Sequence, residues 1–312
     1  MKYCFGVDIG GTTVKLGLFE ENGTVMDKWE IPTYTENEGA RILPDIAVSV
    51  KEKIAEYHLE EDACLGIGVG VPAPVTSDGV VNGSANLGWK YKEVRQELED
   101  LTGMSVVVGN DANVAALGEM WKGGGKGQQN MIMITLGTGV GGGIIVNGKV
   151  IGGAHGAGGE VGHICVNYNE TTDHCGCGNY GCLEQYASAT GIVRLAKKKL
   201  AQETRETLLT KEEVTAKSVF DAVKEKDEVA MEIAEQFGEY LGNGLAILAA
   251  VADPAVFVIG GGVSKAGEVI LRYVEKYYQK RAFFAHKTVE FTLASLGNDA
   301  GIYGAAKLAL DK

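Results

Sequence analysis

The stretch that decides the fold is Val7–Gly23, with the sequence VDIGGTTVKLGLFEENG. Apolar residues over Tyr3–Ile9 predict a buried strand, and Val14–Glu20 predicts a strand that returns beside it. The turn between them consists of Gly10, Gly11, Thr12 and Thr13. Glycines allow a sharp turn and a close approach of the backbone to a ligand, and the exposed amides and hydroxyls can hold phosphate oxygens. The stretch therefore predicts a β-hairpin with a phosphate-binding tip.

A second stretch, Ile134–Gly148 with the sequence ITLGTGVGGGIIVNG, repeats this design around Thr138 and Gly139. We expect Met131–Leu136 and Gly143–Val146 to be its two strands. Further strands alternate with helices in both halves of the chain, but the glycine turns join antiparallel hairpins. This pattern favours two mixed-sheet α/β domains facing a cleft over one doubly wound sheet.

The domain boundary is expected at Gly123–Gly127, where four glycines and a lysine separate a helix from the next strand. Residues 1–122 form the first predicted domain and residues 123–298 the second. A last helix, within 299–312, is expected to cross back and pack on the first domain. In the second half, helices are expected over 187–205, 215–226, 227–252 and 264–280.

The segment Gly137–Gly142 also matches G-x-G-x-x-G, the fingerprint of dinucleotide-binding folds. That fingerprint must open a helix, whereas here it opens the apolar strand beginning at Gly143. No G-x-x-x-x-G-K-[ST] motif occurs either. The residues therefore argue against a Rossmann dehydrogenase and against a Walker-type nucleotide site.

Charged and glycine residues near the turns suggest further contacts with a nucleotide. Asp8 would repel phosphate unless a divalent cation lay between them, so we assign it to Mg²⁺, through water. Lys15 lies near the same turn and is expected to face the phosphates. Gly260, Gly261 and Gly262 follow an apolar strand, and for Gly261 and Gly262 we expect close packing against an adenine or ribose.

A cysteine cluster lies in the stretch His155–Glu184. Three of the six cysteines, Cys175, Cys177 and Cys182, fall within eight positions there. Three thiols and one histidine form a complete tetrahedral set for structural zinc. Both His163 and His174 are candidates for the fourth ligand from the residues alone.

Composition narrows the class of protein. The chain has 312 residues, a net charge of −12, and 45 glycines against 5 prolines. The negative charge opposes non-specific binding to nucleic acid or anionic membrane. Apolar runs are too short to span a membrane, and no signal peptide is expected. With cysteines at metal spacing, these features predict a cytoplasmic protein.

Four motifs together resemble the ROK family of repressors, open reading frames and sugar kinases. They are Asp8–Gly17, Asn110-Asp111, Glu160-Val-Gly-His163 and Cys175-x-Cys177-Gly-x-x-Gly-Cys182-Leu-Glu184. The resemblance runs in order across essentially the whole chain. The segment Cys175–Arg194, CGCGNYGCLEQYASATGIVR, most resembles bacterial glucokinases of the family. It implies the actin-like ATPase/hexokinase (ribonuclease H-like) fold, with ATP and Mg²⁺ between two domains.

The resemblance also implies roles for individual residues. Asp111, at a predicted strand end, is expected to be the general base that takes the proton of the sugar hydroxyl. His163 is favoured over His174 as the fourth zinc ligand, because the family places its ligand histidine after Glu-x-Gly. With four protein ligands the zinc is structural. The expected sugar-binding residues are Ser84, Asn86, Asn110, Asp111, Glu160, His163 and Glu184.

The expected reaction is the ATP-dependent phosphorylation of glucose to glucose 6-phosphate. Fructose, mannose, allose and N-acetyl-hexosamines remain alternative substrates, and a non-catalytic sugar sensor is a further alternative. A repressor of the family would need a DNA-binding segment, for which the residues before Asp8 leave no room. The sequence decides neither between ATP and polyphosphate as donor nor the oligomeric state, although a homodimer, or a tetramer, is expected.

Overall fold

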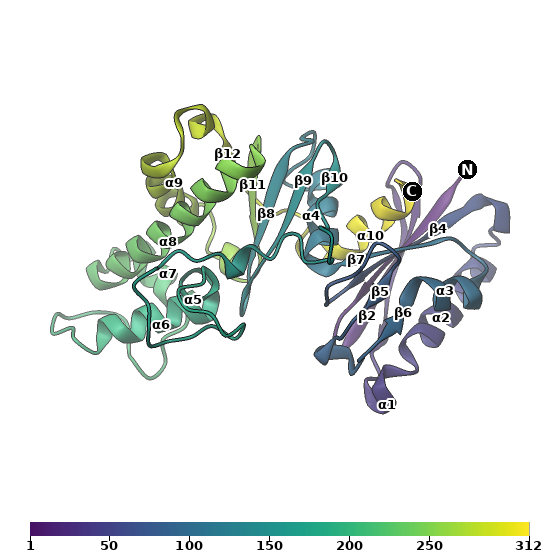
Figure 1. Ribbon diagram of the computed structural model, residues 1–312, viewed down its shortest axis with the longest axis horizontal. Helices are drawn as coiled ribbons and strands as arrows, with labels where there is room; N and C mark the ends of the chain where they lie inside the picture. The colour runs from purple at the N-terminus through teal and green to yellow at the C-terminus, as the bar shows by residue number, and fades with distance from the viewer. Residues whose placement is uncertain (312) are drawn as a thin grey trace. The chain divides into compact units, whose positions relative to one another are not determined.

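The computed structural model describes residues 1–311, and the chain divides into two compact units (Figure 1). Unit 1 comprises Met1–Gly127, Gly143–Gly159 and Leu296–Lys312; unit 2 comprises Gln128–Gly142 and Glu160–Ser295. The sequence assigned residues 143–159 to the second domain, whereas their contacts group them with unit 1. Lys312, the last residue of the predicted C-terminal helix, lies outside the described residues.

Unit 1 contains a five-stranded mixed sheet in the order β3-β2-β1-β4-β7. Strands β1, β2 and β3 are antiparallel neighbours, whereas β4 and β7 run parallel to β1. The glycine turn predicted after Ile9 joins β1 to β2. The strands of this sheet are β1 (Tyr3–Ile9), β2 (Thr13–Glu20), β3 (Val25–Pro32), β4 (Cys64–Val71) and β7 (Val106–Asn110).

Helices cover both faces of this sheet, as the alternation of side chains along β1 requires. Phe5 and Val7 pack in the core with α2 (Ile42–Glu56) and α3 (Val94–Thr102), whereas Cys4 packs with α10 (Ala300–Leu310). A Cβ on Gly6 or on Gly68 would overlap backbone oxygens of α10. Glycine at both positions therefore lets the helix approach the sheet closely. Beside α10 lies α4 (Asp111–Lys122).

The shorter elements of unit 1 lie in its connections. They are α1 (Glu36–Gly39), the 3-10 turns η1 (Glu61–Ala63), η2 (Ala85–Leu87) and η6 (Gly297–Asp299), and the two-stranded sheet of β5 (Val80–Val81) and β6 (Lys92–Glu93). The sequence did not predict β5 and β6, because two-residue strands carry no periodicity.

The second sheet has the order β10-β9-β8-β11-β12, with β8, β11 and β12 parallel to one another. Its strands are β8 (Met131–Leu136), β9 (Val140–Val146), β10 (Lys149–Val150), β11 (Val256–Gly260) and β12 (Glu290–Leu293). The sequence predicted that the returning strand begins at Gly143, but β9 begins three residues earlier, at Val140. The glycines after Val140 are extended, so the turn is shorter than their number suggested.

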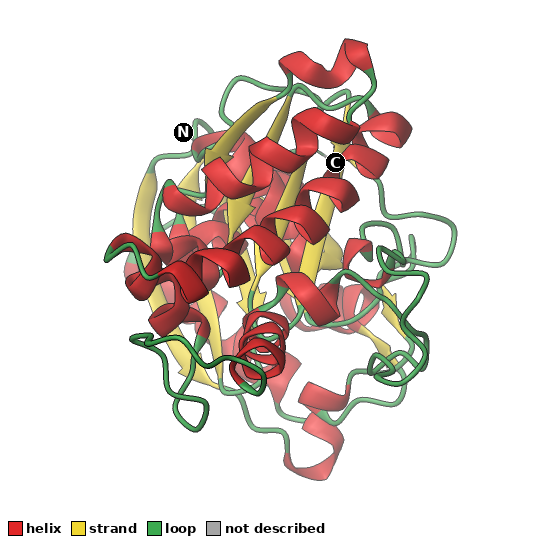
Figure 2. Ribbon diagram, turned by 90° about the vertical axis from the view of Figure 1, so that its left-hand side faces the viewer, coloured by secondary structure: helices red, strands yellow, loops and turns green. Residues whose placement is uncertain are grey.

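Besides its strands, unit 2 contains helices and long loops (Figure 2). Its helices are α5 (Glu184–Ala187), α6 (Ala189–Leu200), α7 (Ala216–Lys224), α8 (Glu228–Ala252) and α9 (Val269–Arg281), and its 3-10 turns are η3 (Val161–His163), η4 (Val263–Ala266) and η5 (Phe284–Thr288). The helix predicted over 187–205 is interrupted at Ser188, which is extended and whose side chain accepts a hydrogen bond from the backbone N–H of Gly191. Ser188 is thus the N-cap of α6.

Aromatic rings join the second sheet to α9. Phe257 of β11 contacts Tyr278 of α9 edge-on, at a centroid distance of 5.7 Å, and Phe291 of β12 packs against both. The predicted fold class is confirmed: two mixed α/β sheets with helices. No helix among residues 1–311 combines the length and the apolar character that crossing a membrane requires.

Candidate functional site

The first predicted phosphate turn is held by hydrogen bonds of its own backbone and of β3. The N–H of Gly10 donates to the carbonyl of Thr13 at 3.0 Å, which closes the hairpin. From the end of β3, the Thr33 hydroxyl donates to the carbonyl of Gly10, and the Thr33 N–H donates to that of Thr12. Gly11 and Thr12 are exposed at the tip. The turn is therefore a fixed loop with an exposed tip.

Asp8 and Lys15 lie on this hairpin as cross-strand partners. The Asp8 carboxylate occupies the space that a side chain at Gly301, in the first turn of α10, would need. Burial and the nearby charge of Asp111 raise the pKa of Asp8 to about 6, while Lys15 lowers it. The Lys15 ammonium also donates to the carbonyl of Asn298 at 3.2 Å. A carboxylate held ionised in this place would be stabilised by a cation.

The raised pKa of Asp8 predicts how stability depends on pH. Its pKa is 3.8 in the unfolded chain and about 6 in the folded one. Protonation of Asp8 therefore stabilises the folded state. This stabilisation is fully present below pH 3.8 and is lost as the pH rises through 6. Asp8→Asn should raise the free energy of unfolding of the ligand-free, Mg²⁺-free protein at pH 7.5 by about 2 kcal/mol.

Urea unfolding at pH 7.5 and at pH 4 measures this effect, with the exposed Asp100→Asn as the control. The gain from Asp8→Asn should be present at pH 7.5 and nearly absent at pH 4. An equal gain at both pH values would contradict the interpretation of Asp8 as a carboxylate destabilised by burial.

The start of α4 places Asn110 and Asp111 at the carboxyl end of β7. The side-chain oxygen of Asn110 accepts hydrogen bonds from the backbone N–H groups of Ala112 and Asn113, at 3.0 and 3.2 Å. Its amide nitrogen donates to the carbonyl of Ala73. Asn110 is thus the N-cap of α4, and capping of this helix does not depend on Asp111. Asp111 is the first residue of the helix, and its Oδ1 accepts from the N–H of Ala112 at 2.8 Å.

Strand register brings Asp8 and Asn110 to the same edge of the first sheet. Asp8 pairs with Gly70 of β4, and Val71, one residue later, pairs with Asn110. Because β1, β4 and β7 are parallel, their carboxyl ends meet at one edge, where ligands of such sheets commonly bind. The structure thus brings together the phosphate turn, Asp8 and Asp111 within unit 1.

Ser84 and Asn86, the other predicted sugar-binding residues of unit 1, differ in exposure. Ser84 is buried, and its hydroxyl donates to the carbonyl of Pro72 at 3.2 Å. Asn86 is exposed on η2, and its backbone oxygen lies 3.5 Å from where a Cβ of Gly11 would stand. The structure therefore brings Asn86 next to the phosphate turn and gives Ser84 a role in holding the loop.

In unit 2, the second phosphate turn joins β8 to β9, and Glu184 lies directly against it. One oxygen of Glu184 accepts from the backbone N–H of Val140 at 3.0 Å, and a Cβ on Gly139 would overlap that oxygen. The carbonyl of Thr138 accepts from the hydroxyl of Thr190, in the first turn of α6. The turn is therefore held by side chains of α5 and α6.

The cysteine cluster lies next to Glu184. The ligand atoms of His163, Cys175, Cys177 and Cys182 all lie within 4.8 Å of one another. The Sγ atoms of Cys177 and Cys182 are 3.7 Å apart. Two thiolates bound tetrahedrally to zinc at 2.3 Å would be about 3.8 Å apart. Four soft or borderline donors at this spacing fit zinc.

His163, and not His174, belongs to this cluster. The Nδ1 of His163 lies 3.7 Å from the Cys175 Sγ, while its Nε2 lies 3.9 Å from a carboxylate oxygen of Glu160. His174 instead contacts the ring of Tyr180 edge-on. The two ring nitrogens of His163 thus face different groups, so that one can bind a metal while the other faces a second ligand.

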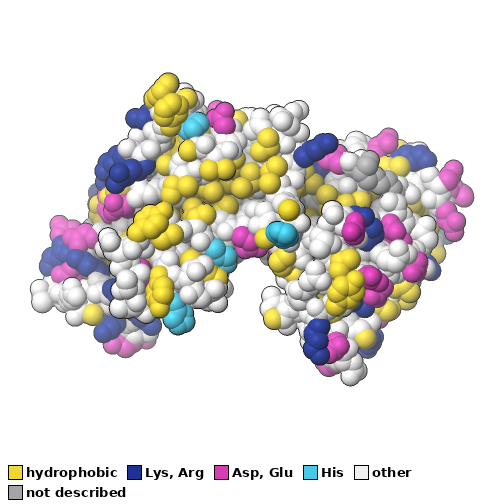
Figure 3. Space-filling model, viewed as in Figure 1, with side chains coloured by type: hydrophobic (Ala, Val, Ile, Leu, Met, Phe, Trp, Pro, Cys, Tyr) yellow, Lys and Arg dark blue, Asp and Glu magenta, His cyan; other side chains and the backbone are white. Residues whose placement is uncertain are grey.

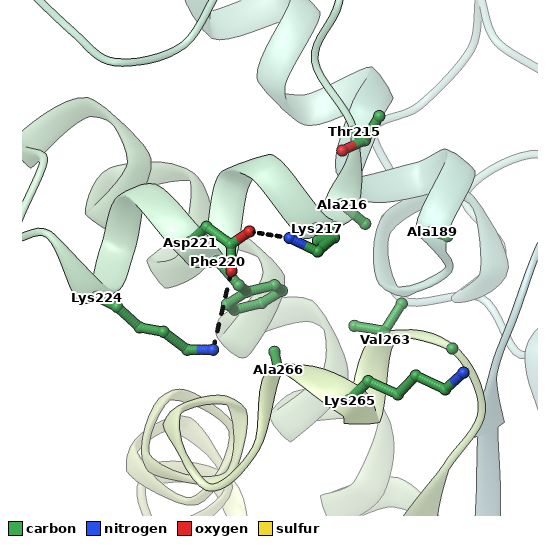
Figure 4. A pocket seen from close by; sticks show the side chains of 11 residues that line it. Ala189, Thr215, Ala216, Lys217, Phe220, Asp221, Lys224, Val263, Lys265 and Ala266 are labelled. Carbon is green, nitrogen blue, oxygen red and sulfur yellow. Dashed lines mark hydrogen bonds and ion pairs between the residues drawn. The ribbon is translucent and has the colours of Figure 1, made fainter.

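The glycine triplet after β11 packs against the second phosphate turn. Gly261 has a φ of +84°, and a Cβ there would lie 2.6 Å from backbone atoms of Leu136, the last residue of β8. Its neighbour Gly262 borders a cavity of about 360 Å³ within unit 2 (Figure 4). The cavity is lined by Ala189, Thr215, Ala216, Lys217, Phe220, Asp221, Lys224, Gly262, Val263, Lys265 and Ala266.

Apolar side chains such as Phe220 and Val263 line one part of this cavity and charged groups another (Figure 4). Asp221 forms ion pairs with Lys217 and Lys224. Sequence reasoning found only Gly262 among the lining residues. The others come from α6, from α7 and its N-cap Thr215, and from η4, and the meeting of side chains from separate helices leaves no local signal in the sequence.

Comparisons with known proteins identify the family of this chain. Residues 4–312 match the ROK family. A glucokinase from Halalkalibacterium halodurans is 42% identical over 97% of this chain and 93% of its own. The structure of a ROK hexokinase from Thermus thermophilus is 31% identical with a TM-score of 0.82, covering 98% of this chain and 97% of that one.

A solved ROK glucokinase from Streptomyces griseus, in complex with glucose and AMPPNP, is also similar. It is 33% identical with a TM-score of 0.73, covering 99% of this chain and all of that one. The family predicted from the four motifs is confirmed, and so is its actin-like ATPase/hexokinase fold. The chain belongs to the ROK family.

Proposed function

We propose that this chain is a glucokinase, which transfers the γ-phosphoryl group of ATP to the 6-hydroxyl of glucose. One observation carries the proposal: Asp8 and Asp111 lie close enough for the charge of one to raise the pKa of the other, at the strand ends beside the phosphate turn. Phosphoryl transfer needs a group that accepts the hydroxyl proton and a means of neutralising phosphate charge. Full-length similarity to glucokinases supports glucose as the acceptor.

In this proposal the groups that bind the nucleotide are those of the two glycine turns, Asp8 and the cavity beside Gly262. The phosphates are held by the amides and hydroxyls of Gly10, Gly11, Thr12 and Thr13 and by the second turn at Thr138 and Gly139. Mg²⁺, held by Asp8 through water, would neutralise phosphate charge. The cavity bordered by Gly262 holds the adenosine, since an apolar wall beside charged groups suits a base linked to a ribose.

Sugar hydroxyls are recognised by the polar side chains that the family resemblance implies. Asp111 accepts the proton of the attacking hydroxyl, because a carboxylate within hydrogen-bond reach is what this step requires. Asn110, Asn86, Glu160, His163 and Glu184 orient the ring. Ser84 contributes by holding its loop, since its hydroxyl bonds to Pro72. Because Glu184 and Asn110 also bond to backbone groups, their orientation is fixed before sugar binds.

Zinc, in this proposal, supports the sugar site without taking part in the reaction. His163, Cys175, Cys177 and Cys182 supply four ligands, so no position is left for water. The Cys175 Sγ lies 3.5 Å from Glu184 Oε1, so the cluster lies beside a carboxylate that we propose binds the sugar. A reducing, cytoplasmic setting is part of the proposal, because oxidised thiols do not bind zinc.

A coupled assay of ADP release tests this proposal. Rates are measured with ATP and Mg²⁺ over glucose, mannose, fructose, allose and N-acetylated hexoses. Glucose should give the highest kcat/KM. A higher value for another hexose would replace glucose as the substrate, and no ADP release with any sugar would favour the non-catalytic sensor. Polyphosphate in place of ATP tests the donor.

Self-association through unit 2 is also proposed. Val251 of α8 and the pair Phe283 and Phe284 after α9 are more than half exposed, at 79%, 55% and 76%. Figure 3 shows hydrophobic side chains gathered at the surface beside α9. Such side chains are common at the core of homodimer interfaces. Light scattering after size-exclusion chromatography should give the mass of a dimer; the mass of a monomer would contradict this.

A further inference from the structure

Helix α4 contacts every connection between the two units from one of its faces. The chain passes between the units after Gly127, after Gly142, after Gly159 and before Leu296. Ala112, Asn113, Ala116 and Glu119 each touch a residue at or near one of these passages. These positions recur at the spacing of one helical face. Both partners of each of these contacts belong to unit 1.

Glu119 makes the strongest of these contacts. It is fully buried, and its two carboxylate oxygens accept from the backbone N–H groups of Gly124, at 2.7 Å, and Leu296, at 2.8 Å. Its own carbonyl accepts from Gly123 and Gly125. A Cβ on Gly123 would overlap the carboxylate, so only glycine fits there. One buried side chain thus holds the first and the last connection.

The two middle connections contact the same face nearer the start of α4. The buried Asn113 donates through its amide to the carbonyl of Gly158 at 3.0 Å. A Cβ on Gly143 would overlap the side chain of Ala116 and lie 3.1 Å from the carbonyl of Ala112. These contacts come from the two turns that follow Asp111, the first residue of the helix.

We propose that Glu119 is a positioning residue for phosphoryl transfer: its carboxylate fixes the connections of unit 2 to the helix that begins with Asp111. Burying a carboxylate is unfavourable unless its oxygens are hydrogen-bonded, so displacing either N–H group would leave a buried oxygen of Glu119 without that partner. Within unit 1, the residues at which the chain leaves for unit 2 are therefore held at fixed positions relative to Asp111. This inference rests on the proposed role of Asp111 as the base.

Glu119→Gln tests the proposal with the smallest change of shape. One oxygen becomes an NH₂ group that faces an N–H donor, so one of the two hydrogen bonds is lost. We expect kcat to fall and the KM for glucose to rise, together lowering kcat/KM roughly 10- to 100-fold.

The matched control is Glu99→Gln. Glu99 also accepts from a backbone N–H of unit 1, that of Val106 at 3.0 Å, but not at a connection. A second pair of variants leaves Glu119 intact. Leu296 has a φ of −81°, which proline can adopt, so Leu296→Pro removes the N–H donor whereas Leu296→Ala keeps it.

Several outcomes decide between this proposal and a purely structural role. Lower kcat and higher KM for glucose in Glu119→Gln and Leu296→Pro, but not in Glu99→Gln and Leu296→Ala, support it. A merely smaller folded fraction would lower kcat and leave KM unchanged, which overturns it. Parent-like kinetics in a folded Glu119→Gln also overturn it, and if that variant does not fold, the Leu296 pair decides. An inactive parent would instead refute the proposed function.

Discussion

Replacing Asp111 with alanine is expected to lower kcat for glucose phosphorylation by a factor of about 10² to 10⁴, the usual contribution of a general base. Without the carboxylate, the sugar hydroxyl must lose its proton to water. The fold should survive, because the capping hydrogen bonds of α4 come from Asn110 and not from Asp111. Steady-state kinetics and thermal unfolding of the same preparation measure the two effects.

Asp111→Asn is the matched control for shape, since it keeps the oxygen that accepts from Ala112 but cannot take a proton. Its kcat should fall as far as that of the alanine variant. It should also lower the pKa of Asp8, because the charge of Asp111 is one of the causes that raise it. The loss of stability linked to Asp8 would then occur at lower pH. Turnover of Asp111→Ala within tenfold of the parent would remove Asp111 from the role of base.

Losing the proposed zinc site should reduce stability and activity together. Cys177→Ser removes one of four ligands whose donor atoms lie within 4.8 Å of one another. Structural zinc sites contribute on the order of 10 kcal/mol, which is comparable to the whole stability of a domain. We therefore expect a large fall in Tm and loss of most activity. Metal content by mass spectrometry should fall from one zinc per chain to nearly none.

Two substitutions near the cluster separate this effect from general damage to the loop. Cys165 and His174 lie beside the four residues but are not among them. Cys165→Ser and His174→Ala should retain zinc, Tm and activity. Parent-like stability and activity in a zinc-free protein would contradict the structural role.

Most of the fold could be predicted because its signals are local. The apolar strands and the glycine turn after Ile9 are visible within a dozen residues. The break at Ser188 was missed, although a serine before a helical stretch is itself a capping signal. Grouping residues 143–159 with unit 1 depends on contacts of Gly143 and Gly158 with α4, more than 25 residues earlier in the chain. Such contacts leave no mark in a single sequence.

For the candidate site, motif residues could be predicted and supporting residues could not. His163 and the three cysteines are brought together because the family motif fixes both their types and spacing. Glu119, in contrast, looks like any surface glutamate of a helix, yet it is fully buried. Its partners Gly124 and Leu296 contribute backbone N–H groups, which every residue but proline offers. The sequence therefore does not show which backbone N–H groups bind Glu119.

The central claim is the transfer of the γ-phosphoryl group of ATP to the 6-hydroxyl of glucose. Phosphorus NMR of a mixture of the protein, ATP, Mg²⁺ and glucose identifies the product directly. We predict that glucose 6-phosphate and ADP appear in equal amounts, and that 6-deoxyglucose yields no sugar phosphate. ADP and inorganic phosphate without glucose 6-phosphate, or a phosphate on another hydroxyl, would contradict it.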